Sequence, residues 1–105
     1  YGFERKCRSV RSCDMAVLDL DGSPMANAKV LAQVQAAVED GAETVILGCA
    51  GMSDLADWLS TESGVPIIEG VAAAVGLVAG LASAGIATSK VGVFAFPPTS
   101  GEGAR

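Results

Sequence analysis

The sequence has 105 residues, half of them hydrophobic, and a formal net charge of −5 from seven basic and twelve acidic side chains. This length fits one small domain with its own core, and the acidic balance argues against nucleic-acid binding through a basic surface. The chain contains no histidine, which excludes Ser-His-Asp and Cys-His catalytic devices and histidine metal sites, so cysteines and carboxylates remain as candidates for chemistry.

The three cysteines, Cys7, Cys13 and Cys49, lack the paired C-x-x-C spacing of a zinc site and are odd in number. They fit a reducing, cytoplasmic location better than a disulfide framework. The opening "YGFERKCRSVR" is charged and has no apolar stretch of the secretory type. The basic side chains near this end are interpreted as a solvated cluster: Arg5, Lys6, Arg8 and Arg11.

In chain order, residues 8–14 predict a short strand and "MAVLDLDGSP" a turn-rich connection. Ser23 followed by Pro24 has the pattern of a helix N-cap with proline in the first turn. The Asp40–Gly41 pair predicts the end of this helix, because glycine adopts the left-handed conformation favoured there. Helical spacing predicts that one apolar face is buried: Val30, Leu31, Val34, Ala37 and Val38.

The β-branched run 44–48 lacks alternation and predicts a strand buried on both faces of a parallel sheet. An amphipathic helix follows and ends near Gly64, with Met52, Leu55, Ala56 and Leu59 on its apolar face. Residues 65–68 then predict a second buried strand, with Pro66 near its start, where a missing N–H matters least.

Residues 70–87 form an uncharged stretch, within which residues 70–84 predict a buried helix ending at Gly85. The stretch is almost long enough to cross a bilayer, but glycine and alanine dominate it and no aromatic belt flanks it, so no membrane span is expected. The predicted organisation is one domain over residues 1–96 and a disordered tail over 97–105.

The alternation of strands and helices predicts an α/β fold, a parallel sheet with flanking helices. Ligands bind beyond the carboxyl ends of the strands in such sheets, where Cys49 stands. Cys49 is either a small packed hydrophobe or a functional thiol. A functional thiol is favoured by Gly48 and Gly51, which carry no side chain, and by the start of the helix that follows. Asp54 and Asp57 oppose it, because carboxylates disfavour a nearby thiolate.

The chain resembles the C-terminal half of the aspartate/glutamate/hydantoin racemase superfamily, most of all the hydantoin and allantoin racemases. The resemblance is carried by "VILGCAGMSDLADWLSTESGVPIIEGVAAAVGLVAGL" and "GIATSK", and "YGFERKCRSVRSCDMAVLDL" is similar to the preceding segment of that branch. Glutamate racemases are less similar, because their motif usually places a histidine after the cysteine. The resemblance covers nearly the whole chain and implies about half of a two-lobed racemase fold.

The resemblance implies a cofactor-independent racemase, with no metal, that acts on a small molecule such as a 5-substituted hydantoin, allantoin or an amino-acid-like compound. In this family two cysteines face each other across the substrate, one removing a proton and the other delivering one. Cys49 matches the second catalytic cysteine. The positions that match the ligand-holding loop and a segment near the cleft are Gly48, Ala50 and Gly51, and Gly70 and Val71.

The family's first catalytic cysteine has no counterpart here, because Cys7 and Cys13 lie outside its motif and are interpreted as buried or half-buried packing residues. Two-base inversion needs two thiols, so we expect the chain alone to be inactive. Two alternatives stay open: a single-cysteine decarboxylase of the arylmalonate type and a non-catalytic module. Association with a missing N-terminal half, or a homo-oligomer, would cover the helix at 70–84.

Glu69 and Trp58 are two further candidate residues. Glu69 is interpreted as a helix-start carboxylate, with a hydrogen bond to a ligand N–H as the alternative. Trp58 is expected to fill the core or a lobe interface rather than to stack on a ligand.

Overall fold

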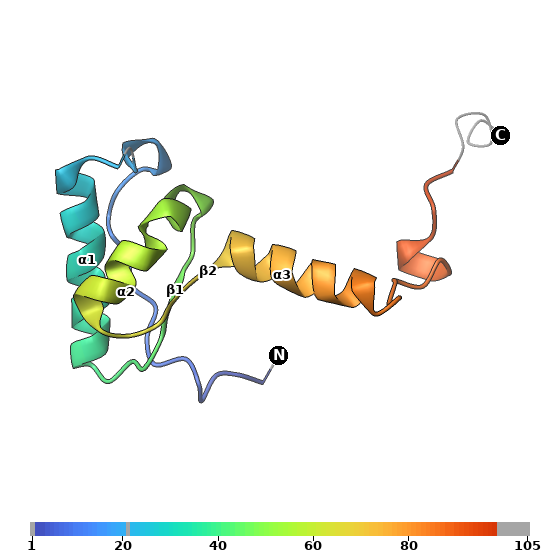
Figure 1. Cartoon of the computed structure of the whole chain (residues 1–105), viewed down its shortest axis with the longest axis horizontal. Helices are drawn as coiled ribbons and strands as arrows, with labels where there is room; N and C mark the ends of the chain where they lie inside the picture. The colour runs from blue at the N-terminus through green and yellow to red at the C-terminus, as the bar shows by residue number, and fades with distance from the viewer. Residues whose placement is uncertain (1, 21, 99–105) are drawn as a thin grey trace. The chain divides into compact units, whose positions relative to one another are not determined.

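The computed structural model describes residues 2–20 and 22–98 of the chain (Figure 1). The chain divides into two compact units, Tyr1–Ala74 and Val75–Arg105. The predicted tail lies, from residue 99 onward, outside the described residues. The elements in chain order are η1 (Val17–Asp19), α1 (Pro24–Glu39), β1 (Val45–Leu47), η2 (Ala50–Leu55), α2 (Ala56–Ser63), β2 (Ile67–Glu69), α3 (Gly70–Ser83) and η3 (Gly92–Phe94), where η denotes a 3-10 helix.

Helix α1 begins and ends where local sequence chemistry predicts. The Ser23 hydroxyl accepts a hydrogen bond from the Ala26 N–H at 3.3 Å, and Pro24 occupies the first helical position. At the other end Gly41 adopts a φ of 92°, which is a left-handed conformation that glycine tolerates without strain. Both predicted boundaries of this helix are confirmed.

Strands β1 and β2 form a parallel two-stranded sheet, joined by η2 and α2 as one β-α-β unit. The predicted α/β fold with a parallel sheet and flanking helices is confirmed. The prediction of burial on both faces is wrong, because Ile46 is 71% exposed and Ile68 is 41% exposed. These two side chains share the sheet face that no described helix covers, whereas Leu47 points to the covered face and is buried.

The core of this unit lies where α1, α2 and β1 meet, and Figure 1 shows the two helices beside each other. Leu59 is fully buried there and packs with Val30, Val34 and Leu47. The predicted apolar faces of both helices therefore meet each other and one face of the sheet. The helix that contains Leu59 ends at Gly64 with a φ of 73°, as predicted.

Residues 8–14 do not form the predicted strand. The observed alternation of helices and strands therefore begins with helix α1 instead of with a strand. Val10 is 91% exposed, and a strand gains little where its apolar side chain has no partner. The segment is instead attached to the end of α1. Arg8 Nε donates to the Asp40 carbonyl oxygen at 2.7 Å, and the Arg11 guanidinium forms an ion pair with the Asp40 carboxylate.

Helix α3 forms over Gly70–Ser83 and ends at Gly85, which has a φ of 71°, as predicted. Its predicted burial is wrong. None of its residues is buried, and Leu77 is 70% exposed. Apolar periodicity alone cannot say which partner covers a helix. Among the described residues, no helix is both long enough and apolar enough to cross a membrane.

Candidate active site

The two strands end side by side, and this brings together the two segments expected to form the site. The last residues of β1 and β2, Leu47 and Glu69, are register partners in the parallel sheet. The 48–49 and 70–71 dipeptides therefore leave the sheet at the same carboxyl edge, with neighbouring strands about 4.8 Å apart. The structure thus places Cys49 at the edge where α/β sheets bind ligands.

Cys49 lies half-buried between β1 and η2, in extended backbone with φ −138° and ψ 133°. Its carbonyl oxygen accepts the Met52 N–H at 3.0 Å, which is the first hydrogen bond of η2. The N–H groups of Ala50 and Gly51 precede that bond and so have no acceptor within the 3-10 helix. This loop therefore presents one accessible thiol and two backbone donors.

The glycines expected to hold a ligand differ in their surroundings. A Cβ at Gly48 or at Gly70 would meet nothing within 4 Å. A Cβ at Gly51 would lie 3.7 Å from Cys49 Sγ and 3.8 Å from the Leu20 side chain. Gly51 thus separates the thiol from Leu20 without placing a side chain between them. Val71 is 49% exposed at the start of α3.

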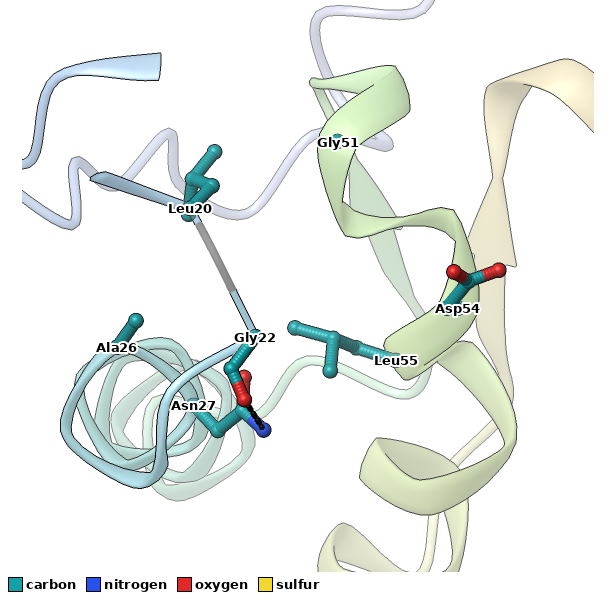
Figure 2. A pocket seen from close by; sticks show the side chains of 7 residues that line it. All are labelled: Leu20, Gly22, Ala26, Asn27, Gly51, Asp54 and Leu55. Atoms are coloured by element: carbon teal, nitrogen blue, oxygen red, sulfur yellow. Dashed lines mark hydrogen bonds between the residues drawn. The ribbon is translucent and has the colours of Figure 1, made fainter. Parts of the chain in front are cut away.

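A pocket of about 220 Å³ lies beside this loop (Figure 2). One wall is the segment that leads into α1, and the other is η2. Figure 2 shows the Leu55 side chain pointing from η2 toward Gly22, whereas the Asp54 carboxylate points away from both of these residues. The lining residues are Leu20, Gly22, Ala26 and Asn27 on the first wall and Gly51, Asp54 and Leu55 on the second.

Glu69 connects the Cys49 loop to the start of α3. Its Oε2 accepts the Ser53 hydroxyl at 2.8 Å and the Val71 N–H at 2.9 Å, and its Oε1 accepts the Ala72 N–H. The Ser53 hydroxyl and the Ala72 N–H, with a further contribution from the Val71 N–H, lower the pKa of Glu69, although partial desolvation opposes them. The prediction of a helix-start carboxylate is confirmed.

Acid should therefore weaken the fold through Glu69. Because the folded-state pKa lies below the ordinary 4.5, the stabilisation is complete above about pH 5 and is lost as the pH falls through the lowered value. We expect the urea midpoints of wild type and Glu69→Gln to differ above pH 5 and to converge in acid, measured by circular dichroism. A difference that is the same at every pH would contradict this role for the charge.

The other two cysteines lie in the segment before α1 rather than in the loop after β1. Cys7 is exposed, so the expectation that it packs is wrong; its thiol instead donates to the Ser9 carbonyl oxygen at 3.8 Å. Cys13 is half-buried against the core, as expected. Burial, and secondarily the Asp14 carboxylate, raise the pKa of the Cys13 thiol, which favours its protonated form. Trp58 is 38% exposed and does not belong to the buried core.

Three residues of this site escaped the sequence reasoning. Ser53 is one of many serines, and only the folded chain brings it to Glu69, sixteen residues further along the chain. Leu20 and Asn27 lie in a connection and on an amphipathic helix, where neither has a local signal. The sequence offers one signal for Ser53, which is its position one helical turn after Cys49.

Comparisons with known proteins identify the family of this chain. A family model described as Asp/Glu/Hydantoin racemase matches residues 1–78. The chain belongs to the Asp/Glu/hydantoin racemase family. The family resemblance drawn from the "LGCAGM" and "GVPIIEG" segments is thereby confirmed.

Individual members of the racemase family match most of this chain. A hydantoin racemase of Rhizobium meliloti is 50% identical over 99 residues, which are 92% of this chain and 41% of that protein. Another, of Pseudomonas sp. strain NS671, is 39% identical over 92% of the chain and 40% of its own length. The solved allantoin racemase of Klebsiella pneumoniae is 45% identical, with a TM-score of 0.82, over 92% of this chain and 40% of that chain. The chain thus spans about two fifths of these relatives.

Proposed function

We propose that this chain supplies one catalytic thiol, that of Cys49, to a cofactor-independent racemase. The substrate is a hydantoin or allantoin-like ring whose stereocentre bears a hydrogen next to a carbonyl. The observation that carries the proposal is the position of Cys49, half-buried at the ligand-facing edge of the sheet in a racemase-family chain. The relatives named as hydantoin and allantoin racemases support the substrate class.

The reaction needs one proton carrier on each face of the ring. The Cys49 thiolate takes the proton from C5, and the electron pair of that C–H bond moves toward the adjacent carbonyl oxygen. A second thiol then delivers a proton to the opposite face of the carbon, and the carbonyl is restored. Cysteine suits this exchange because its ordinary pKa of about 8.5 is readily lowered toward neutrality.

The chain's own groups also fit the charge that develops during the reaction. The Ala50 and Gly51 N–H groups have no acceptor within η2 and can donate to the enolate oxygen. Gly48 and Gly70 leave open space in which a ring can approach the backbone, beside the exposed Val71. Ser53 and Glu69 hold the loop to the start of α3. The second thiol comes from a part of the enzyme other than Cys7 and Cys13.

A chimera tests this proposal. The chain is placed in the Rhizobium meliloti hydantoin racemase instead of the matching 41% of that protein, over which the two are 50% identical. We expect the chimera to racemise one enantiomer of 5-isobutylhydantoin and to exchange its C5 hydrogen for deuterium in D2O, as followed by optical rotation and NMR.

Circular dichroism and gel filtration serve as the folding controls for the chimera. A folded chimera with neither exchange nor racemisation overturns the proposal. If that chimera instead releases carbon dioxide from phenylmalonate, the proposed function becomes that of a single-cysteine decarboxylase. Inactivity in both assays leaves the chain as a non-catalytic module.

The exposed α3 supports a further part of the proposal, which is that the chain associates with another polypeptide. The helix carries no charge, and Val75, Leu77 and Val78 are 63%, 70% and 65% exposed. A helix that is apolar over most of its surface is stable in water only when another surface covers it. We propose a second copy, or the remainder of a family member, as the partner.

We therefore expect the isolated chain to self-associate as its concentration rises. The double substitution Val75→Lys and Val78→Lys should shift the equilibrium toward the monomer, because association would then bury two charged side chains in an apolar contact. Multi-angle light scattering measures the change, and Gln35→Lys, at an exposed position of α1, is the matched control. A wild-type chain that stays monomeric at every concentration would contradict the association.

A further inference from the structure

The carboxylate at the end of β2 gathers hydrogen-bond donors from two different segments of the chain. Glu69 Oε2 accepts the Ser53 hydroxyl of η2 at 2.8 Å and the Val71 N–H at 2.9 Å. Its Oε1 accepts the Ala72 N–H. Figure 1 shows β2 running directly into α3, so the two N–H donors belong to the first turn of that helix. Glu69 therefore ties η2 to the junction between β2 and α3.

The η2 helix depends on such a tie, because its own hydrogen bonds hold it weakly. It runs over six residues, Ala50–Leu55, whereas 3-10 helices of more than three or four residues are uncommon owing to their poorer hydrogen-bond geometry. The Cys49 side chain makes no capping hydrogen bond to the described residues of the first turn. The Ser53 hydroxyl lies one turn after Cys49, so its hydrogen bond to Glu69 fixes that turn from outside the helix.

The hydrogen bond between Ser53 and Glu69 is of the stronger kind. Both residues are half-buried, and a hydrogen bond to an ionised acceptor is about twice as strong as one between neutral groups. The Ser53 hydroxyl and then the two N–H groups of α3 lower the pKa of Glu69, so the carboxyl is ionised near neutral pH. The constraint is therefore present under the conditions in which a cysteine thiol exchanges protons.

The two ends of this hydrogen bond lie on the two segments proposed to meet the substrate. Ser53 belongs to the short helix that follows the Cys49 thiol. Glu69 is the residue before Gly70, where α3 begins and where a Cβ would meet nothing within 4 Å. Fixing Ser53 against Glu69 therefore fixes the place of the thiol relative to the open space at the start of α3.

We propose that Ser53 and Glu69 are positioning residues, which hold the Cys49 thiol in place relative to the start of α3 while it exchanges a proton with the substrate. The proposal rests on the function proposed above. In this role both side chains act through η2 and take no part in the proton transfer. Their loss therefore lowers kcat, which depends on the alignment of the reacting groups, more than it raises KM.

Ser53→Ala in the racemase chimera tests the role in the reaction. We expect kcat for racemisation of 5-isobutylhydantoin to fall about tenfold or more and KM to change by no more than about twofold, because a displacement of about 1 Å in a reacting group can cost about 100-fold in rate. Ser53→Thr, which keeps the hydroxyl, should recover at least about half of the parental kcat. Glu69→Gln should lower kcat as well, because a carboxamide offers one acceptor oxygen to three donors.

Ser60→Ala is the matched control for the loss of a serine hydroxyl. The Ser60 hydroxyl is also half-buried in the same β-α-β unit, but it donates to the Val65 carbonyl oxygen at 3.0 Å, after the end of α2. We expect Ser60→Ala to keep kcat within about twofold of the parent. A loss of stability common to both alanine variants is thereby separated from the displacement of the thiol.

The 105-residue chain gives a second readout that does not require catalysis. The Met52 N–H donates to the Cys49 carbonyl oxygen at 3.0 Å, so its hydrogen exchange, followed by NMR, reports the opening of the first turn of η2. We expect Ser53→Ala to speed exchange at Met52 at least about fivefold. The Asp40 N–H, which donates to the Ala36 carbonyl oxygen at the end of α1, should keep its rate, and Ser60→Ala should leave Met52 unchanged.

Three results would overturn the positioning role: a parental kcat in both Ser53→Ala and Glu69→Gln, a loss of kcat in Ser60→Ala equal to that in Ser53→Ala, or unchanged exchange at Met52 in Ser53→Ala. A rise in KM with no fall in kcat would also overturn it. If the parent chimera does not racemise but Ser53→Ala still speeds exchange at Met52, the proposed reaction is rejected and the constraint on η2 is retained.

Discussion

Replacing Cys49 with serine in the racemase chimera should lower kcat/KM at least about 100-fold for racemisation, and for C5 hydrogen exchange of the enantiomer whose hydrogen faces Cys49. A serine hydroxyl is not ionised near neutral pH and cannot act as the base, and positioned acid–base groups contribute about 10² to 10⁴ in rate. Loss of Cys49 removes the proton carrier on one face of the ring, so inversion falls for both enantiomers, whereas hydrogen exchange falls for the enantiomer whose C5 hydrogen faces Cys49. Proton NMR in D2O and polarimetry measure the two rates.

The other cysteines provide matched controls for this change. Cys7 is exposed and Cys13 is half-buried against the core, so Cys7→Ser and Cys13→Ser should keep their rates within about twofold, since substitutions away from reacting atoms leave transition-state binding intact. A Cys49→Ser enzyme that stays within about tenfold of the parent would contradict the role of the thiol. Equal losses in all three variants would indicate damage to the fold.

Leu59→Ala should unfold most of the chain at room temperature. Leu59 is fully buried among Val30, Val34 and Leu47, where α1, α2 and β1 meet. Leucine-to-alanine changes in a core cost about 2–5 kcal/mol, and small domains are stable by only a few kcal/mol more than that. Far-ultraviolet circular dichroism should show lost helix signal, and the cooperative urea transition should disappear.

Leu18→Ala is the control for this prediction, because it makes the same chemical change at a site that is 92% exposed. Its free energy of unfolding should change by no more than about 0.5 kcal/mol. If Leu59→Ala also kept its cooperative transition, with a loss below about 1 kcal/mol, the cluster of four buried residues would not be what holds this unit together.

The features predicted correctly from the sequence are those decided within a few residues. The Ser23–Pro24 start and the Gly41 end of α1 follow from capping chemistry, and Gly64 and Gly85 end their helices for the same reason. The position of Cys49 at the sheet edge follows from the strand before it and the parallel pairing. The roles of Cys49 and its neighbouring glycines remain predictions.

The features predicted wrongly depend on partners that lie far along the chain or outside it. Val10 and Ile46 lie in sequence segments typical of buried strands, but no described element covers their side chains. The α3 helix forms as predicted and is nevertheless exposed, because periodicity defines a face and not what packs on it. The Ser53–Glu69 hydrogen bond and the wall formed by Leu20 exist only after folding.

A sheet of only two strands has a consequence for how this molecule behaves in concentrated solution. Each strand has one outer edge whose peptide groups face no described strand, and Ile46 and Ile68 lie on the uncovered face beside those edges. An extended peptide that docks there finds peptide hydrogen bonds and an oily surface at the same place. We therefore expect these edges to be where a further extended chain adds to the sheet as the concentration rises.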